Sequence, residues 1–467
     1  MNHFTRLSLT LSILTAGILP AAAATFTAGG LQYTTIDEAT VAVKKYVEGS
    51  DIVVPSTVRD DDGNVYTVVA VNASAFGSAA VKSVSFPSTV TSLDYYAFNR
   101  SSVERVTFAE GLESIGYGAF SMCTSLSEVN LPASLKVLGA VWELAGWGGS
   151  AFAQCTSLTK ITIPAGVTEL PQLTFQGCTA LTEVTLNEGL TTIGERVFEE
   201  CTALKSLQLP STVTTIERAA FMKTGLDNPV VPASIRIIPN SCYLWCGDMK
   251  SFTIEEGIVE VGKQAFADCA LESVEVPASV EWIRTDAFQG NGNVKTIRLG
   301  SGLRRLGHSA LAVWAPSMQA NVPQWSLTDI YLESTVPPVH EQNDDHFDQL
   351  DDDFFFGGKE FTDELREKFY SEVKLHVPDA AVEAYRSADI WKEFKNINGS
   401  TDAVTDIVAP CPLAVSGGVA TAPGLIEVYS VSGVRVAAGT GSVDLGAIGG
   451  GVYIVKAGAE TIKAVVR

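Results

Sequence analysis

A large apolar residue returns every 22 or 23 positions along the middle of the chain, and Ala usually precedes it. One step in the series is wider and covers 32 residues, from Phe120 to Phe152. A unit this short cannot bury its own apolar face, so consecutive units must stack on one another. The period therefore predicts a solenoid, whose anchor residues are Phe76, Phe98, Phe120, Phe152, Phe175, Phe198, Phe221, Tyr243, Phe266, Phe288 and Leu311.

The residues between two anchors follow a second pattern. Segment 161–163 reads Ile-Thr-Ile, the alternation typical of a half-buried strand. Pro164 follows it and would end the strand, because Pro cannot donate to a strand ladder. A further apolar pair, Val167 and Leu170, precedes the next anchor. Each coil is therefore expected to contain one short strand and to close on its far side with the apolar pair and the anchor.

On each strand, the polar positions of the alternation are expected to point outward and to form columns across the stacked coils. These columns are rich in Ser and Thr and carry charges of both signs. Two interpretations remain open: a merely solvated β-surface, or the extended binding face that solenoids commonly use. The candidate binding residues are Arg105, Thr107, Glu128, Asn130, Lys160, Thr162, Glu183, Thr185, Ser206 and Gln208, and the columns continue at Ser83, Ser85, Ser251, Thr253, Ser273, Glu275, Thr296 and Arg298.

The repeats resemble a known family. Segment 155–168, which reads Cys-Thr-Ser-Leu-Thr-Lys-Ile-Thr-Ile-Pro-Ala-Gly-Val-Thr and precedes an aromatic anchor, is similar to the BspA-like leucine-rich repeats of bacterial surface proteins. Segments 51–55 and 66–68 resemble the opening strands of that family, and 373–398 resembles its closing segment. The resemblance implies a mainly β, right-handed leucine-rich-repeat coil. It also implies adhesin-like binding of host matrix proteins, other bacteria or mucosal surfaces.

The C-terminal part has a different pattern. Ser, Thr, Gly, Ala and Pro dominate residues 399–423, which we interpret as a linker. Alternating segments separated by Gly turns then predict a small β-sandwich. Segment 451–456, Gly-Val-Tyr-Ile-Val-Lys, resembles the C-terminal sorting domains of the type IX secretion system of Bacteroidetes. That resemblance implies recognition by the secretion machinery, removal of the tail and attachment to the outer surface; because the tail is short, a relic module is the alternative.

The N-terminus has the features of a secretory signal. A weakly basic start is followed by the apolar run from Leu7 to Leu19, then by Pro20 and four alanines. We therefore expect export to the bacterial cell surface or the medium. The predicted domains are a signal peptide (1–24), an N-terminal cap (25–66), the leucine-rich repeats (67–311), a closing segment with an acidic insertion (312–398), the linker (399–423) and the sorting-like β-sandwich (424–467).

Two insertions interrupt the pattern. The wide step contains Trp142 and Trp147 among glycines, where exposed Trp would offer a platform for sugar rings or an anchor for a protein, or would fold back onto the solenoid edge. Segment 341–372 is strongly acidic, but its spacing matches no calcium loop, so we expect a solvated loop. A helix is expected over 362–370, and Asp379 is expected to cap a closing helix over 380–385.

The net charge bears on the kind of partner, and the cysteine positions bear on the interior of the coils. A net charge of −21 disfavours nucleic-acid binding, which needs a basic stripe, and no segment after the signal has the apolar length for membrane insertion. Six cysteines each follow an anchor by three residues, which predicts a buried column of thiols, with one or more disulfides as the alternative. They are Cys123, Cys155, Cys178, Cys201, Cys246 and Cys269.

The sequence contains no motif for chemistry: neither HExxH, nor G-x-S-x-G, nor a phosphate loop. We expect no catalytic residue, no cofactor and no metal. The leading hypothesis is a non-catalytic adhesin or protein-binding module for host or bacterial extracellular partners. A surface glycan-binding protein for nutrient capture, and a structural envelope protein without a specific ligand, are the alternatives.

Overall fold

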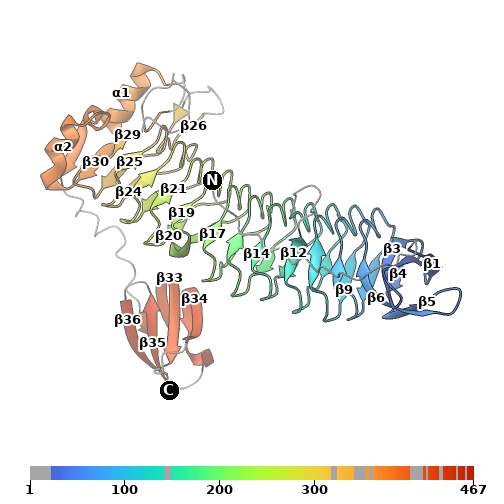
Figure 1. Cartoon of the computed structure of the whole chain (residues 1–467). Coiled ribbons are helices and arrows are strands. Elements are labelled where there is room, and N and C mark those ends of the chain that lie inside the picture. The colour runs from blue at the N-terminus through green and yellow to red at the C-terminus, as the bar shows by residue number, and fades with distance from the viewer. Residues whose placement is uncertain are drawn as a thin grey trace, which may run out of the picture. The chain divides into compact units, whose positions relative to one another are not determined.

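The computed structural model describes residues 23–140, 149–316, 323–340, 354–356, 361–399, 414–416, 419–430, 435–448, 451–457 and 460–466. The described residues up to Gly399 form one compact unit, and those after Ser400 form another. The larger unit is a stack of coils, as Figure 1 shows, and its strands pair in parallel with the coils before and after them. This confirms the predicted mainly β repeat solenoid. The last two residues of the predicted signal peptide are described; the rest of it lies outside the described residues.

Most coils contribute a strand to each of two faces. The first face, which we call the long-strand face, contains several strands of four residues. Its strands are β4 (Asp51–Val53), β7 (Ser83–Phe86), β9 (Arg105–Phe108), β11 (Glu128–Val129), β13 (Lys160–Thr162), β15 (Glu183–Thr185), β18 (Val230–Val231), β20 (Thr253–Ile254), β22 (Ser273–Val276), β24 (Thr296–Leu299), β28 (Asp329–Leu332), β30 (Lys374–Val377) and β31 (Asn396–Gly399).

The second face, the short-strand face, is formed where the second apolar pair of each repeat turns inward. From β14 onward its strands are two residues long. They are β3 (Thr40–Tyr46), β6 (Val65–Val71), β8 (Ser92–Leu93), β10 (Ser114–Gly116), β12 (Val137–Ala140), β14 (Glu169–Leu170), β16 (Thr192–Ile193), β17 (Thr215–Ile216), β19 (Ile237–Ile238), β21 (Glu260–Val261), β23 (Trp282–Ile283), β25 (Arg305–Leu306) and β29 (Val339–His340).

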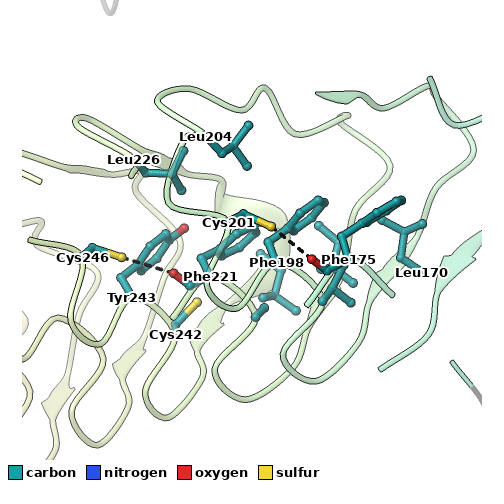
Figure 2. Close-up of a cluster of buried hydrophobic side chains, with 14 of the residues drawn as sticks. Leu170, Phe175, Phe198, Cys201, Leu204, Phe221, Leu226, Cys242, Tyr243 and Cys246 are labelled. Atoms are coloured by element: carbon teal, nitrogen blue, oxygen red, sulfur yellow. Dashed lines mark hydrogen bonds between the residues drawn. The ribbon is translucent and has the colours of Figure 1, made fainter. Parts of the chain in front are cut away.

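The anchors form one continuous column of stacked rings inside the coils. From Phe76 to Phe288, successive ring centroids lie 4.5–5.7 Å apart with interplanar angles of 2–15°. Figure 2 shows part of this column, from Phe175 to Tyr243. The rings of Phe120 and Phe152 stack at 5.1 Å although 32 residues separate them, so the wide step in the sequence does not interrupt the column. The period in the sequence is thus the period of this interior column.

The cysteines extend the interior next to the rings. All the cysteines among the described residues are buried and free, which confirms the predicted column of thiols. In each of the six repeated positions, Sγ donates to the carbonyl oxygen of the anchor in the coil before; Cys201 contacts Phe175 in this way at 3.3 Å, and Cys246 contacts Phe221 at 3.2 Å (Figure 2). Burial raises the pKa of the Cys178 thiol to about 12. These thiols therefore act as packing groups and weak donors.

Both ends of the stack are closed. At the N-terminus, β1 (Thr25–Ala28) and β2 (Leu31–Thr35) add antiparallel strands to β3, and β5 (Thr57–Arg59) pairs with β6. At the C-terminal end, a helix was predicted over 362–370, and the structure has α1 (Asp363–Glu372) there; it begins after Thr362, whose hydroxyl accepts a hydrogen bond from the Leu365 N–H. The prediction for Asp379 was wrong. Pro378 precedes the short 3₁₀ turn η2 (Asp379–Ala381), so Asp379 is its first residue and its carboxylate caps nothing.

The remaining short elements complete the larger unit. Helix α2 (Val382–Ser387) follows η2, and η3 (Trp391–Glu393) precedes β31. Strands β26 (Ala315–Pro316) and β27 (Pro323–Gln324) form an antiparallel pair, and η1 (Ala233–Ile235) lies between β18 and β19. Residues 341–353 of the predicted acidic insertion lie outside the described residues.

The C-terminal unit is a sheet of five antiparallel strands. These are β32 (Ala414–Ser416), β33 (Val419–Ser430), β34 (Arg435–Asp444), β35 (Gly451–Ala457) and β36 (Glu460–Val466), with η5 (Gly446–Ile448) after β34. Ile426, Val428, Leu445 and Val455 are buried in its own small core. The sequence predicted a sandwich, whereas the described strands form a single sheet. Strand β33 begins at Val419, inside the segment that we interpreted as a linker, and its register with β34 shifts between Thr421 and Leu425.

Candidate binding face

The register of the long-strand face sets the first candidate residues side by side. Arg105 on β9 lies opposite Glu128 on β11, and its Nε is 2.8 Å from Oε2 of that glutamate. The hydrogen bond and charge of Glu128 raise the pKa of Arg105 above its ordinary value. Both side chains are more than half exposed, and Thr107 beside them is partly exposed. The structure therefore places these three residues outward, as predicted.

The next pair of strands repeats the arrangement. Lys160 on β13 lies opposite Glu183 on β15, and Thr162 lies opposite Thr185. All four residues are exposed. They share the long-strand face with Arg105, and their role in binding stays a prediction.

Asn130 has a structural role, linking two coils, that the sequence did not indicate. It lies just after β11, where its Oδ1 accepts a hydrogen bond from the Phe108 N–H at 3.0 Å. Its Nδ2 donates to the Phe108 carbonyl oxygen at 3.1 Å. The amide thus replaces backbone bonds of the strand ladder, and it holds two coils together.

Ser206 and Gln208 are exposed, but the predicted strand that should carry them is absent: the structure assigns no strand to residues 204–209. In the next coil, Pro229 occupies the position that aligns with Ser206, and Pro has no N–H to donate to a neighbouring coil. Trp142 and Trp147 lie outside the described residues.

The C-terminal half of the long-strand face has a different surface. Parallel register aligns Glu275, Arg298, Tyr331 and His376 in one row across β22, β24, β28 and β30. The Arg298 guanidinium carbon lies 4.4 Å from the Tyr331 ring centroid. The rings of Tyr331 and His376 stack at 4.4 Å with an interplanar angle of 11°. Three flat side chains therefore follow one another across the strands, an arrangement that we call the planar row (Arg298, Tyr331 and His376).

Asp329 fixes the end of the planar row. Its Oδ1 lies 2.8 Å from Nε2 of His376. Burial works against ionisation of Asp329, yet the bonds from His376 and Thr328 hold the pKa of its carboxyl below the ordinary value. Burial, reinforced by the charge of Asp329, raises the pKa of Tyr331. The row is thus held both by stacking and by the hydrogen bond between His376 and Asp329.

A shallow hollow of about 340 Å³ lies next to the planar row. It occupies the ends of β20, β22 and β24 on the long-strand face. Its lining combines apolar or small residues with four charged side chains. The lining includes Phe252, Ile254, Val276, Pro277, Ala278, Gly300, Glu256, Glu275, Arg298 and Glu333.

Sequence reasoning found Glu275 and Arg298 but missed Tyr331, His376 and Asp329. Those three lie in the closing segment, which we had not aligned with the repeats. A signal was present, because segments 329–332 and 374–377 read Asp-Ile-Tyr-Leu and Lys-Leu-His-Val, the same alternation as in the repeats.

Aromatic side chains also occur on other surfaces of the solenoid. On the short-strand face, the guanidinium carbons of Arg284 and Arg305 lie 3.4 and 4.0 Å from the Trp282 ring centroid. On the turns that follow the anchors, Trp245 is 48% exposed, and its Nε1 donates to Asp268 at 3.2 Å.

Across the described part of the chain, no group of three or more His, Cys, Asp or Glu is arranged to hold a metal ion. The helices described here are also too short and too polar to cross a membrane.

Comparison with known proteins gives a family match. Residues 65–141, 144–247 and 214–333 match the model of the BspA type leucine rich repeat region, in six copies. Together these segments cover more than half of the chain. No relative was found among curated proteins.

Several solved structures are similar to the chain. A leucine rich cell surface protein from Faecalibacterium prausnitzii is 22% identical, with a TM-score of 0.41, over 67% of this chain and 96% of that one. The pneumococcal vaccine antigen PcpA is 18% identical, with a TM-score of 0.43, over 81% of this chain and 99% of that one. A leucine rich repeat protein from T. pallidum is 30% identical, with a TM-score of 0.37, over 42% of this chain and 87% of that one.

Proposed function

Because the chain belongs to the BspA-type leucine-rich repeat family, we propose that it binds an extracellular protein through its long-strand face, without catalysis. The protein is exported and displayed at the bacterial cell surface. Its partner is a protein of the host or of another bacterium, as an adhesin requires. The rigid stack of coils holds the binding side chains in fixed register, so little order is lost when a partner docks.

The observation that carries this proposal is the planar row beside the hollow. The outward positions of a solenoid strand need only be polar to keep it soluble, and those near the N-terminus are Ser, Thr and paired ions. Stacked Arg and Tyr side chains are the types that dominate binding energy at protein interfaces. Their position within the five strands β22, β24, β28, β30 and β31, which pair in one sheet of the long-strand face, supports a protein ligand that spans several coils.

Export and display rest on the two ends of the sequence. The signal peptide predicted at 1–24 supports export. The separate C-terminal sheet supports a sorting role for the tail, with cleavage between the two compact units. In this proposal the secretion machinery recognises the tail, and the solenoid remains attached outside.

Location is tested by intact mass in outer-surface, periplasmic and medium fractions of the native cell. We expect a surface or medium form that begins near Thr25 and lacks the C-terminal sheet. A full-length periplasmic form that ends at Arg467 would contradict surface display.

The binding face is tested with a photo-crosslinking amino acid introduced at one position per variant. We choose Thr296 on the long-strand face and Thr215 on the short-strand face, because both are strand positions of solvent-facing Thr. Incubation with intact host cells or neighbouring bacteria should give protein crosslinks from position 296 and few from 215. Equal crosslinking from both positions would refute the assignment of the face.

Glycan capture is the second candidate, and one described residue favours it. Trp245 is half exposed, and its indole is oriented by the bond to Asp268, as in a platform for a sugar ring. A glycan array followed by Trp245→Ala and Trp147→Ala distinguishes the two candidates. Sugar binding that these variants abolish, while protein crosslinking from position 296 persists, would assign a separate glycan site. A protein that captures neither ligand would be left with a structural role in the envelope.

A further inference from the structure

The hollow on the long-strand face is produced by a change of residue size. Pro277 follows β22, as Pro follows the strand in several repeats, but Gly300 follows β24. A Cβ at Gly300 would lie 2.5 Å from the backbone N of Ala278, so the coils can pack this closely only with glycine here. Pro277, Ala278 and Gly300 therefore form a low apolar floor, and the longer side chains around it form the walls.

The walls carry an excess of negative charge. Three carboxylates, those of Glu256, Glu275 and Glu333, face the hollow together with one guanidinium, that of Arg298. Glu256 is engaged, because it accepts hydrogen bonds from the Ala278 and Ser279 N–H groups at 3.1 Å each. Within the described residues, the side chains of Glu275 and Glu333 form no hydrogen bond and no ion pair. Two carboxylates are thus free to receive a cationic group.

The free carboxylates differ from two acids at the N-terminal end of this face. Glu128 is paired with Arg105 at 2.8 Å, and Asp51 accepts a bond from the Ser83 hydroxyl at 2.6 Å. Arg298, the cation nearest in register to Glu275, is instead directed over the Tyr331 ring. The planar row therefore holds Arg298 in place and leaves the negative charge of Glu275 exposed beside the apolar floor.

The shape of the hollow decides between a metal ion and a larger cation. The acids of the described residues do not converge into a metal cluster. The hollow of about 340 Å³ lies near the lower end of the range of about 300–1,000 Å³ for small-ligand pockets. A Lys or Arg side chain fits this chemistry, because its apolar stem can pack on Pro277 and Ala278 while its charged end reaches a carboxylate.

We infer that the hollow receives a Lys or Arg side chain from a basic segment of the partner protein. The charged end binds between Glu275 and Glu333. Arg298 does not contact this charged end; it donates to a carbonyl or carboxylate of the same segment. This inference deepens the proposed function and rests on it, since it names the chemistry of the partner at the proposed face. The net charge of −21 adds long-range attraction for such a segment.

The test uses the full mature chain and a fluorescent Lys-rich peptide, with a Gln-for-Lys peptide of the same length as the reference. Fluorescence anisotropy should show binding of the Lys peptide that weakens as salt rises, and much weaker binding of the Gln peptide. In the double variant Glu275→Gln/Glu333→Gln, we expect the Kd for the Lys peptide to rise by about tenfold or more.

The matched control is Glu38→Gln/Glu48→Gln, which changes the net charge equally at two exposed acids of the N-terminal cap. It should leave the Kd within about twofold of the native value, as expected for a small change in long-range attraction. Equal weakening in both double variants would reduce the effect to net charge and would overturn the site. Competition by Ca²⁺ in the native chain, lost in the Glu275→Gln/Glu333→Gln variant, would assign the carboxylates to a metal instead.

The proposed function and this inference fail in different ways. If crosslinking from position 296 identifies a partner that the Glu275→Gln/Glu333→Gln variant binds normally, the face stands and the basic-segment inference is wrong. If crosslinks arise equally from both faces, the proposed function itself fails.

Discussion

Strands β7 and β9 near the N-terminus and strands β24 and β28 nearer the C-terminus have the same interior but different exteriors. In all four, apolar residues of alternating positions are buried against the ring column. Outside, the first pair presents Ser, Thr and an ion pair to solvent, whereas the second pair presents Arg298 and a Tyr331 that is only 9% exposed. The interior is dictated by the fold, and the exterior is free to vary. Function is therefore to be sought where the exterior departs from simple solubility.

The largest expected effect tests the shared interior. Phe98→Ala in the N-terminal half and Phe288→Ala in the C-terminal half each remove a fully buried ring from the stacked column. We expect each to lower the free energy of unfolding by about 3–5 kcal/mol. Chemical denaturation followed by circular dichroism measures both. If only one of the two variants is destabilised, the halves do not share one kind of core.

The next effect separates the two exteriors. Tyr331→Ala removes the ring between Arg298 and His376, and we expect a loss of about 2–3 kcal/mol from burial and stacking. Thr107→Ala, at an outward position of the N-terminal half, should change stability by less than about 0.5 kcal/mol. Tyr331→Phe keeps the ring and should stay close to the native chain. Equal losses of unfolding free energy in the Tyr331→Ala and Thr107→Ala variants would show that the planar row does not stabilise the chain more than an ordinary outward position does.

The sequence was sufficient for the interior and insufficient for the planar row. Phe76 to Phe288 identified the coil because burial permits few residue types, and the six cysteines followed from the same period. Tyr331 and His376 are separated by 45 residues in the chain and become neighbours only through parallel register. That register depends on how the closing segment continues the stack beyond the last anchor, which the period alone does not specify.

Local chemistry explains the smaller misses. Asn130 looked like a free outward amide, yet both of its polar atoms bond the backbone of Phe108. Gly300 and the hollow beside it could not be predicted from the repeat pattern. The pattern indicates which residues turn inward, but it does not indicate where the outer surface is concave. The size of a residue at one turn matters only after its neighbours are placed.

A pH experiment tests whether Asp329 stabilises the end of the planar row. The pKa of Asp329 is lower in the folded chain than in the unfolded chain, so its contribution to stability is present above the unfolded pKa. It is lost as the pH falls through the folded pKa. The stability difference between the native chain and Asp329→Asn should therefore shrink as the pH falls from neutral into the acidic range below the ordinary Asp value of about 3.9. Denaturation midpoints of both chains across that range measure it, and a difference that stays constant would contradict the role of His376 as partner.

The smallest effect is expected at the ion pair of the N-terminal half, where geometry alone would suggest the opposite. Arg105 and Glu128 approach to 2.8 Å, closely similar to the distance between His376 and Asp329. However, water screens both members of the first pair, since their side chains are 60% and 58% exposed, while those of His376 and Asp329 are 16% and 21% exposed. Arg105→Ala, Glu128→Ala and the double variant should therefore show no measurable shift in the denaturation midpoint. The contrary result would be a clear coupling energy between the two substitutions that persists at high salt. It would mean that the side chains of the N-terminal half are also held in fixed positions, so that the two halves of this face differ only in residue type.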